Sequence, residues 1–133
     1  MSKNFLSRES ILQQKDLIVE EVFVKPWNGW VCVKSLTGKE RDQWERDIVD
    51  VKGKNVITKD NIRAKLVALS VVDPESLKPV FTYGDVEVLG SKNASALDAI
   101  FQTASRLSKI SDSDVEELVK NSSKTQEGDS TLN

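Results

Sequence analysis

The segment from Asn93 to Leu107 carries the clearest amphipathic pattern in this chain of 133 residues, and it limits the folds that the chain can adopt. Apolar side chains recur along it at intervals of three and four residues, at Leu97, Ile100, Phe101, Ala104 and Leu107. This spacing places them on one face of an α-helix. Because such a face must be covered, the pattern predicts a helix that begins at Asn93 or Ser95 and packs against other elements of a core.

Two β-type runs near the start of the chain predict a hairpin. Residues Leu17 to Val24 are rich in β-branched side chains, and Lys25-Pro26 ends that run. A second run, from Trp30 to Leu36, follows directly after Asn28-Gly29. Two strands joined by a short connection of Pro, Asn and Gly are typical of an antiparallel hairpin.

The apolar run from Ile62 to Val72 fits either a buried strand or a buried helix, since periodicity cannot separate the two. Its valines and the turn residues Asp73-Pro74-Glu75 favour a strand. Residues Lys78 to Thr82 would then form a short return strand. The interpretation is a second hairpin, which joins the first in one antiparallel sheet.

Capping patterns predict further helices. Thr37-Gly38-Lys39-Glu40 is a capping box, because the threonine oxygen and the glutamate can satisfy free amides at a helix start. The helix should end near Lys52-Gly53 and carry an apolar face of Trp44, Ile48 and Val51. A second capping pattern, Thr82-Tyr83-Gly84-Asp85, predicts a short helix through Leu89.

A last helix is expected near Ser111, with Asp112 and Asp114 at its positive end. Together these elements predict one α+β domain over residues 17–120, with a small antiparallel sheet of two hairpins packed with three to four helices. Residues 1–16 are polar and predict a loose arm with room for one short helix. Residues 121–133 contain one apolar side chain and cannot offset their ordering entropy, so we expect a disordered polar tail.

The absence of histidine and the single cysteine, Cys32, remove most familiar catalytic and metal sites. Histidine is the usual general base near neutral pH and the commonest metal ligand. One cysteine cannot form an internal disulfide or a CxxC motif. The glycines form neither of the common phosphate-binding patterns. We therefore expect no enzyme activity, no cofactor and no metal ion.

Charge and hydropathy restrict the partners and the compartment. The net charge of −2 disfavours a general nucleic-acid binder, which normally carries a basic surface. Residues Met1 to Asp16 lack the apolar stretch of a signal peptide. The most apolar run, Leu66 to Val72, is too short to cross a bilayer. We expect no membrane association and a cytoplasmic protein.

Two groups of residues are candidates for protein binding, and each has a structural alternative. Trp27 and Trp30 lie close together around the predicted hairpin turn. They could fill the core under the sheet, or one could stay exposed as an interface anchor, where tryptophan is enriched. The final helix carries Val115, Leu118 and Val119, which could pack on the domain or present an apolar stripe to a partner.

The linear order of these segments resembles the tail assembly chaperones of long-tailed, non-contractile bacteriophages and prophages. The resemblance covers residues 17 to 120 and depends on the order of its parts rather than on a chemical motif. The matching segments are Trp27–Lys34, Leu36–Arg41, Lys65–Asp73, Val80–Thr82, Asp85–Gly90 and the helix from Asn93 to Leu107.

The resemblance implies a helper in the host cytoplasm that coats the long tape-measure protein and keeps it soluble. It implies a second partner, the major tail-tube protein, whose subunits displace the chaperone during polymerisation. In many members a translational frameshift adds a second domain that contacts the tube protein, and this chain would be the short form. Such a chaperone is absent from the finished virion. It could form a homo-oligomer, and its oligomeric state is left open.

Two alternatives belong to other functional classes. The chain could be a structural head-tail joining or minor tail protein, which would persist in finished particles. It could also be a small regulator that binds a host protein.

Overall fold

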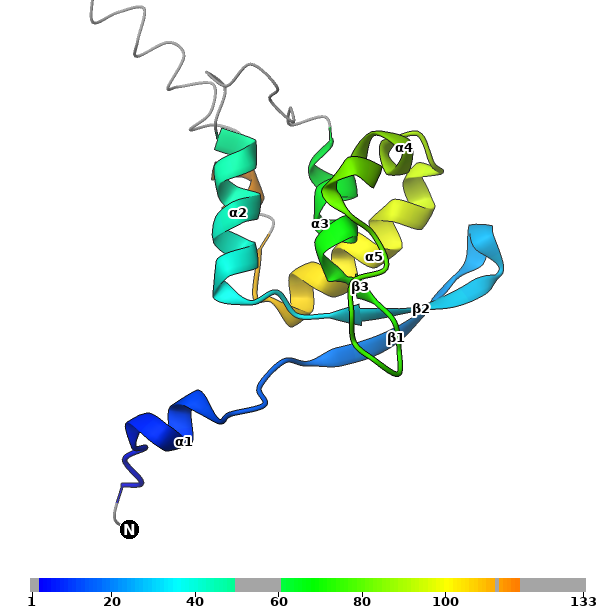
Figure 1. Cartoon of the computed structure of the whole chain (residues 1–133). Helices are drawn as coiled ribbons and strands as arrows, with labels where there is room; N and C mark the ends of the chain where they lie inside the picture. The colour runs from blue at the N-terminus through cyan, green and yellow to red at the C-terminus, as the bar shows by residue number, and fades with distance from the viewer. Residues whose placement is uncertain (1–2, 50–60, 112, 118–133) are drawn as a thin grey trace, which may run out of the picture.

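The computed structural model describes residues 3–49, 61–111 and 113–117, and shows an α+β fold (Figure 1). The fold class predicted from the sequence is confirmed. The elements in chain order are α1 (Arg8–Leu12), β1 (Val19–Val24), η1 (Lys25–Trp27), β2 (Gly29–Lys34), α2 (Gly38–Val49), α3 (Ile62–Ser70), β3 (Val71–Val72), η3 (Tyr83–Asp85), α4 (Val86–Gly90), α5 (Ala94–Leu107) and a last helical turn at 113–117.

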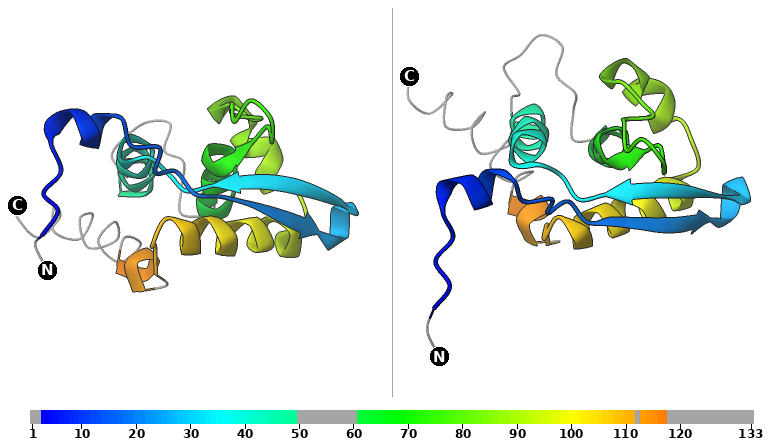
Figure 2. Two further views of the ribbon diagram at one scale, coloured as in Figure 1. Left: turned by 90° about the horizontal axis from the view of Figure 1, so that it is seen from below. Right: turned by 60° about the horizontal axis from the view of Figure 1, so that its bottom comes forward.

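The first hairpin is confirmed, and its strands β1 and β2 pair antiparallel. Asn28 makes the reversal between them possible, because it adopts the left-handed conformation with φ of 49° that asparagine tolerates well. Alternate residues of the hairpin face α5, and Val24 and Val33 on that face are fully buried. Figure 2 shows α5 along one side of the hairpin and α2, α3 and α4 on the other.

The strand predicted over residues 62–72 is wrong for most of its length, since Ile62–Ser70 is helix α3. This helix contacts α2, α4 and α5, and every residue from Ala64 to Ala68 is buried. A helix covered on several sides needs no polar face, so its sequence lacks the period that would identify it. Only Val71–Val72 is extended, and it pairs antiparallel with Cys32 and Val33 of β2.

The predicted return strand at Lys78–Thr82 is also wrong. In its place the structure has a single β-bridge between Val72 and Pro79. The Val80 amide beside this bridge donates to the Val71 carbonyl at 3.2 Å. Proline has no amide hydrogen with which to extend a ladder. Within the described residues the sheet therefore has three strands in the order β1-β2-β3, with β2 in the centre.

The predicted start of α2 is confirmed by both bonds of its capping box. The Glu40 amide donates to Thr37 Oγ1 at 3.1 Å, and the Thr37 amide donates to Glu40 Oε1 at 2.9 Å. Trp44 on this helix is fully buried, and its Nε1 donates to the Ile62 carbonyl at 3.4 Å. The predicted helix end at Lys52-Gly53 lies outside the described residues.

The predicted amphipathic helix is α5, which begins at Ala94 with Asn93 as its cap. Asn93 Oδ1 accepts from the amides of Ser95 at 2.9 Å and Ala96 at 3.2 Å. All five members of the apolar stripe are buried. The short helix predicted after Thr82 is also confirmed, as η3 followed by α4.

The two ends of the chain are described in part. The arm contains the short helix α1, capped by Ser7, and no residue of α1 is buried. At the other end, the Ser111 amide donates to Asp114 Oδ2 at 2.9 Å, and the Asp114 amide donates to Ser111 Oγ at 3.1 Å. The predicted polar tail at 121–133 lies outside the described residues, so the division into arm, domain and tail stays a prediction.

Candidate functional site

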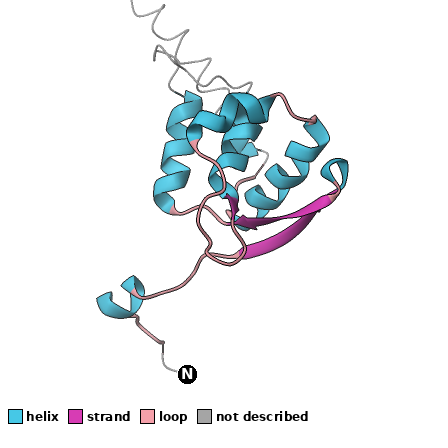
Figure 3. Cartoon of the chain, turned by 45° about the vertical axis from the view of Figure 1, so that its right-hand side comes forward, coloured by secondary structure: helices cyan, strands magenta, loops and turns pink. Residues whose placement is uncertain are grey.

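An exposed aromatic pair lies near the tip of the hairpin. Phe23 of β1 and Trp30 of β2 are directly opposite each other, with ring centroids 5.3 Å apart and ring planes at 63°. Trp30 is 69% exposed and Phe23 is 44% exposed. Both side chains lie on the face of the hairpin opposite α5, and the tip extends beyond the helices (Figure 3). This hairpin aromatic pair is the most exposed aromatic feature on the sheet.

Trp27 and Trp30, the candidate binding residues from the sequence, differ in how far the structure exposes them. Trp30 is not core filler, because most of its side chain is open to solvent. Trp27 lies in η1 at the tip, which contacts α5, and it is 37% exposed. Sequence reasoning missed Phe23, although the strand register of a hairpin with its turn at Asn28-Gly29 would have placed it beside Trp30.

An open groove adjoins Trp30 on the same face of the sheet, with a volume of about 260 Å³. Its lining comes from all three strands and from the loop after β3: Glu21, Trp30, Val31, Cys32, Val71, Val72, Asp73, Pro74, Val80 and Phe81. We call it the hairpin groove. Eight of these residues are apolar, and the two charged ones, Glu21 and Asp73, are both carboxylates. The groove is therefore an apolar recess with an acidic character.

The carboxylate of Asp73 is held in its ionised form by the turn that follows it. Its Oδ2 accepts from the Ser76 amide at 2.8 Å, from Ser76 Oγ at 3.1 Å and from the Glu75 amide at 3.0 Å. The hydrogen bonds from Ser76 and then from Glu75 lower the pKa of Asp73 below its ordinary value. The negative charge at this wall of the groove therefore persists well below neutral pH.

Cys32 lies in the lining of the groove, and its thiol is not a reactive one. The residue is buried, and burial is the main reason why the pKa of its thiol is raised. The nearby charges of Glu21 and Asp73 raise it further. The nucleophilic species is the thiolate, which is disfavoured here at neutral pH.

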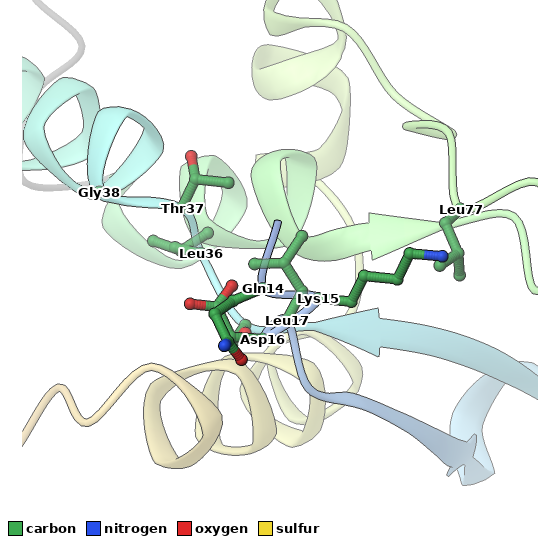
Figure 4. Close-up of a pocket in the computed structure, with 9 residues that line it drawn as sticks. Gln14, Lys15, Asp16, Leu17, Leu36, Thr37, Gly38 and Leu77 are labelled. Atoms are coloured by element: carbon green, nitrogen blue, oxygen red, sulfur yellow. The ribbon is translucent and has the colours of Figure 1, made fainter. Parts of the chain in front are cut away.

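A second and larger groove, of about 600 Å³, lies where the arm joins the body (Figure 4). It is lined by Gln14, Lys15, Asp16, Leu17, Ser35, Leu36, Thr37, Gly38 and Leu77. Figure 4 shows the Lys15 side chain extended along this groove toward Leu77. One cation, one carboxylate and three leucines give it mixed chemistry, and the described residues that line it include no group of reactive side chains.

Two lysines lie in the interior and have charged neighbours. Lys34 is buried at the end of β2 and forms an ion pair with Glu40, the residue that also caps α2. Lys65 on α3 is fully buried, and that burial lowers its pKa from 10.5 to about 8, although the charge of Asp47 acts in the opposite direction. Burial, with Asp47 as the next cause, raises the pKa of Tyr83 nearby. Full burial keeps Lys65 away from any substrate.

The last candidate residues lie at the end of the described chain. Val115 is partly buried and packs against the core, which favours the structural alternative for this position. Arg41 Nη2 lies 3.9 Å from Asp114 Oδ2 and links this turn to α2. Leu118 and Val119 are outside the described residues, so their proposed role in binding stays a prediction.

Residues 3–49, 61–111 and 113–117 contain neither a metal-binding cluster nor a membrane-spanning helix. No three Cys, Asp or Glu side chains there are grouped so that they could hold a metal ion. No helix in that part of the chain is long and apolar enough to cross a bilayer. Comparison with protein-family models, with curated proteins and with solved structures gives no match to this chain.

Proposed function

We propose that this protein acts by binding another protein through the hairpin aromatic pair, without catalysing a reaction. The observation that carries this proposal is the exposure of Trp30 beside Phe23 on a hairpin tip that extends beyond the helices. Large aromatic side chains lose unfavourable contact with water when a partner covers them, and tryptophan is enriched among residues that dominate binding energy. The two rings already pack against each other, which reduces the side-chain entropy that they lose on binding.

The resemblance in segment order adds a specific role to this proposal: a tail assembly chaperone in the bacterial host cytoplasm. Its client would be the tape-measure protein, with the major tail-tube protein as a second partner, reached through a frameshifted longer form. A small aromatic contact suits this role, since each copy would bind weakly and be displaced easily. Many weak contacts along one long client add up through avidity.

Co-expression with the tape-measure protein of the same phage tests the proposal. We expect the wild-type chain to keep the client in the soluble fraction, and Phe23→Ala and Trp30→Ala to lose most of that effect. Val88→Ala is the matched control, because Val88 is an exposed apolar residue on α4, away from the hairpin. A client that precipitates equally with and without the wild-type chain would refute the chaperone proposal.

Mass spectrometry of purified virions distinguishes this proposal from that of a structural tail component. A chaperone should be absent from finished particles, whereas a joining or minor tail protein should be present at a fixed copy number. Recovery of the chain from particles at such a number would replace the chaperone proposal with the structural one.

A further inference from the structure

The arm before β1 exposes an unusual concentration of apolar side chains. Phe5 is 84% exposed, and more than half of Leu6, Ile11 and Leu12 is open to solvent. Figure 1 shows the arm directed away from the body, with α1 separated from the other helices labelled there. Two exposed apolar pairs within one short segment, Phe5-Leu6 and Ile11-Leu12, make the arm a candidate for contact with a partner.

The charges around Phe5 are all positive. Lys3 and Arg8 flank Phe5 and Leu6, and no acidic residue lies between positions 3 and 8. The first carboxylate, Glu9, lies beyond them and pairs with Arg8 at 3.7 Å in an exposed position. The arm therefore presents an apolar side chain between two cations.

The hairpin groove has the opposite arrangement, with an apolar lining and two carboxylates. Among the described residues, no lysine or arginine lines it. Lys78 of the same loop is outside that lining, and its backbone carbonyl accepts from the Asp73 amide at 2.9 Å. At about 260 Å³ the groove is smaller than the roughly 300–1,000 Å³ typical of small-molecule sites. Its size and charge suit a bulky apolar side chain next to a lysine or arginine.

The position of the groove favours an arm from another molecule. The arm joins β1 at Val19, whereas the groove runs along the middle of the hairpin from Glu21 and Cys32 to Trp30, on the other side of Val19 from the arm. The arm leads away from the first residue of β1, so it would have to reverse its direction to reach the groove of its own chain (Figures 1 and 2). A neighbouring copy can offer its groove without that reversal.

We infer that the N-terminal arm of one copy docks in the hairpin groove of a second copy, with Phe5 in the apolar recess and Lys3 and Arg8 near Glu21 and Asp73. This contact goes beyond the proposed function and does not depend on it. Mutual exchange of arms closes a two-fold dimer, while exchange in one direction builds rings or open chains. Either form covers Phe5 and neutralises the two carboxylates of the groove.

Sedimentation velocity of the full chain over a range of concentrations tests the contact. We expect wild-type protein to self-associate and Phe5→Ala to weaken association by about tenfold or more, since one phenylalanine loses its burial. Ile11→Ala is the matched control, an exposed apolar residue of the same arm outside the Lys3–Arg8 segment, and should change association by less than about threefold. Weakening by added salt should accompany the charge contact.

Charge reversal gives an independent measurement with an internal rescue. Glu21→Lys alone and Lys3→Glu/Arg8→Glu alone should each reduce association by roughly fivefold to tenfold, and the three changes together should restore much of it. A monomeric wild-type chain overturns the inference. The inference is also overturned if Phe5→Ala leaves self-association unchanged. It is overturned as well if the losses of association caused by the charge reversals simply add up in the combined variant.

The Trp30 indole resonance separates docking between copies from docking within one chain. In the associated wild-type protein it should shift with concentration, and Phe5→Ala should remove that shift. A monomer in which Phe5→Ala moves the Trp30 resonance would show the arm in its own groove, which also overturns a contact between copies. Phe23 does not line the groove, so Phe23→Ala tests client binding separately from association between copies.

Discussion

Replacement of Lys65 should remove a specific part of the pH dependence of stability. Its pKa is about 8 in the folded protein and 10.5 as an ordinary lysine. Below pH 8 both states carry the proton, whereas between pH 8 and 10.5 the unfolded state binds more protons than the folded one. The free energy of unfolding therefore rises with pH through this window, and the full difference is worth about 3 kcal/mol.

A practical window for the measurement is pH 7 to 9, in which the Lys65 contribution to the free energy of unfolding grows by about 1.3 kcal/mol. At higher pH two other groups act in the opposite direction. The raised pKa values of Cys32 and Tyr83 make the folded state hold protons that the unfolded state loses, so their contributions to stability fall as pH rises above 9 and 10. The difference between wild type and a Lys65 variant cancels those contributions.

Urea unfolding at pH 7, 8 and 9 is the appropriate assay, with Lys65→Met and Lys65→Arg as the variants. Methionine does not titrate, and arginine stays charged throughout this range. In both variants the rise of about 1.3 kcal/mol in the free energy of unfolding between pH 7 and 9 should therefore be lost. Lys92→Met changes an exposed lysine and should keep the wild-type pH dependence. A Lys65→Met curve parallel to the wild-type curve would refute the assignment of the shifted pKa to Lys65.

Three further predictions concern stability and reactivity. Thr37→Ala should cost about 1 kcal/mol in urea unfolding, and Glu40→Ala about 2–3 kcal/mol because the buried lysine of β2 also loses its ion-pair partner; equal costs would contradict that role. Trp44→Ala should cost about 3–5 kcal/mol and Trp30→Ala less than about 1 kcal/mol, and a reversed order would contradict their burial. Alkylation of Cys32 at pH 8 should be much slower in native protein than in urea, and equal rates would show an accessible thiolate.

Local pattern was sufficient where neighbouring residues alone select a conformation. The α5 stripe from Leu97 to Leu107 and the capping box at Thr37 and Glu40 both appear in the structure as the sequence predicts. The hairpin around Asn28-Gly29 is equally local, since its turn and both strands lie within a short stretch of chain. Each of these elements depends on contacts between residues close in sequence.

Local pattern failed where burial on all sides removed the periodicity. Helix α3 is covered by α2, α4 and α5, so its apolar residues do not alternate with polar ones in any period. The fully buried Lys65 in the middle of this helix follows from the same packing. Strand β3 pairs with β2 over two residues only. Its start is set by the end of α3 at Ser70, where the backbone becomes extended.

The sequence by itself determined the α+β class, the first hairpin, the capped helices and the absence of histidine. Only the tertiary structure decided which aromatic side chains stay exposed. Helix α5 covers one face of the hairpin, so Val24 and Val33 are buried while Phe23 and Trp30 are open to a partner. The acidic groove likewise exists only because the loop after β3 brings Asp73 close to Glu21, far apart in the sequence, and no local pattern records that approach.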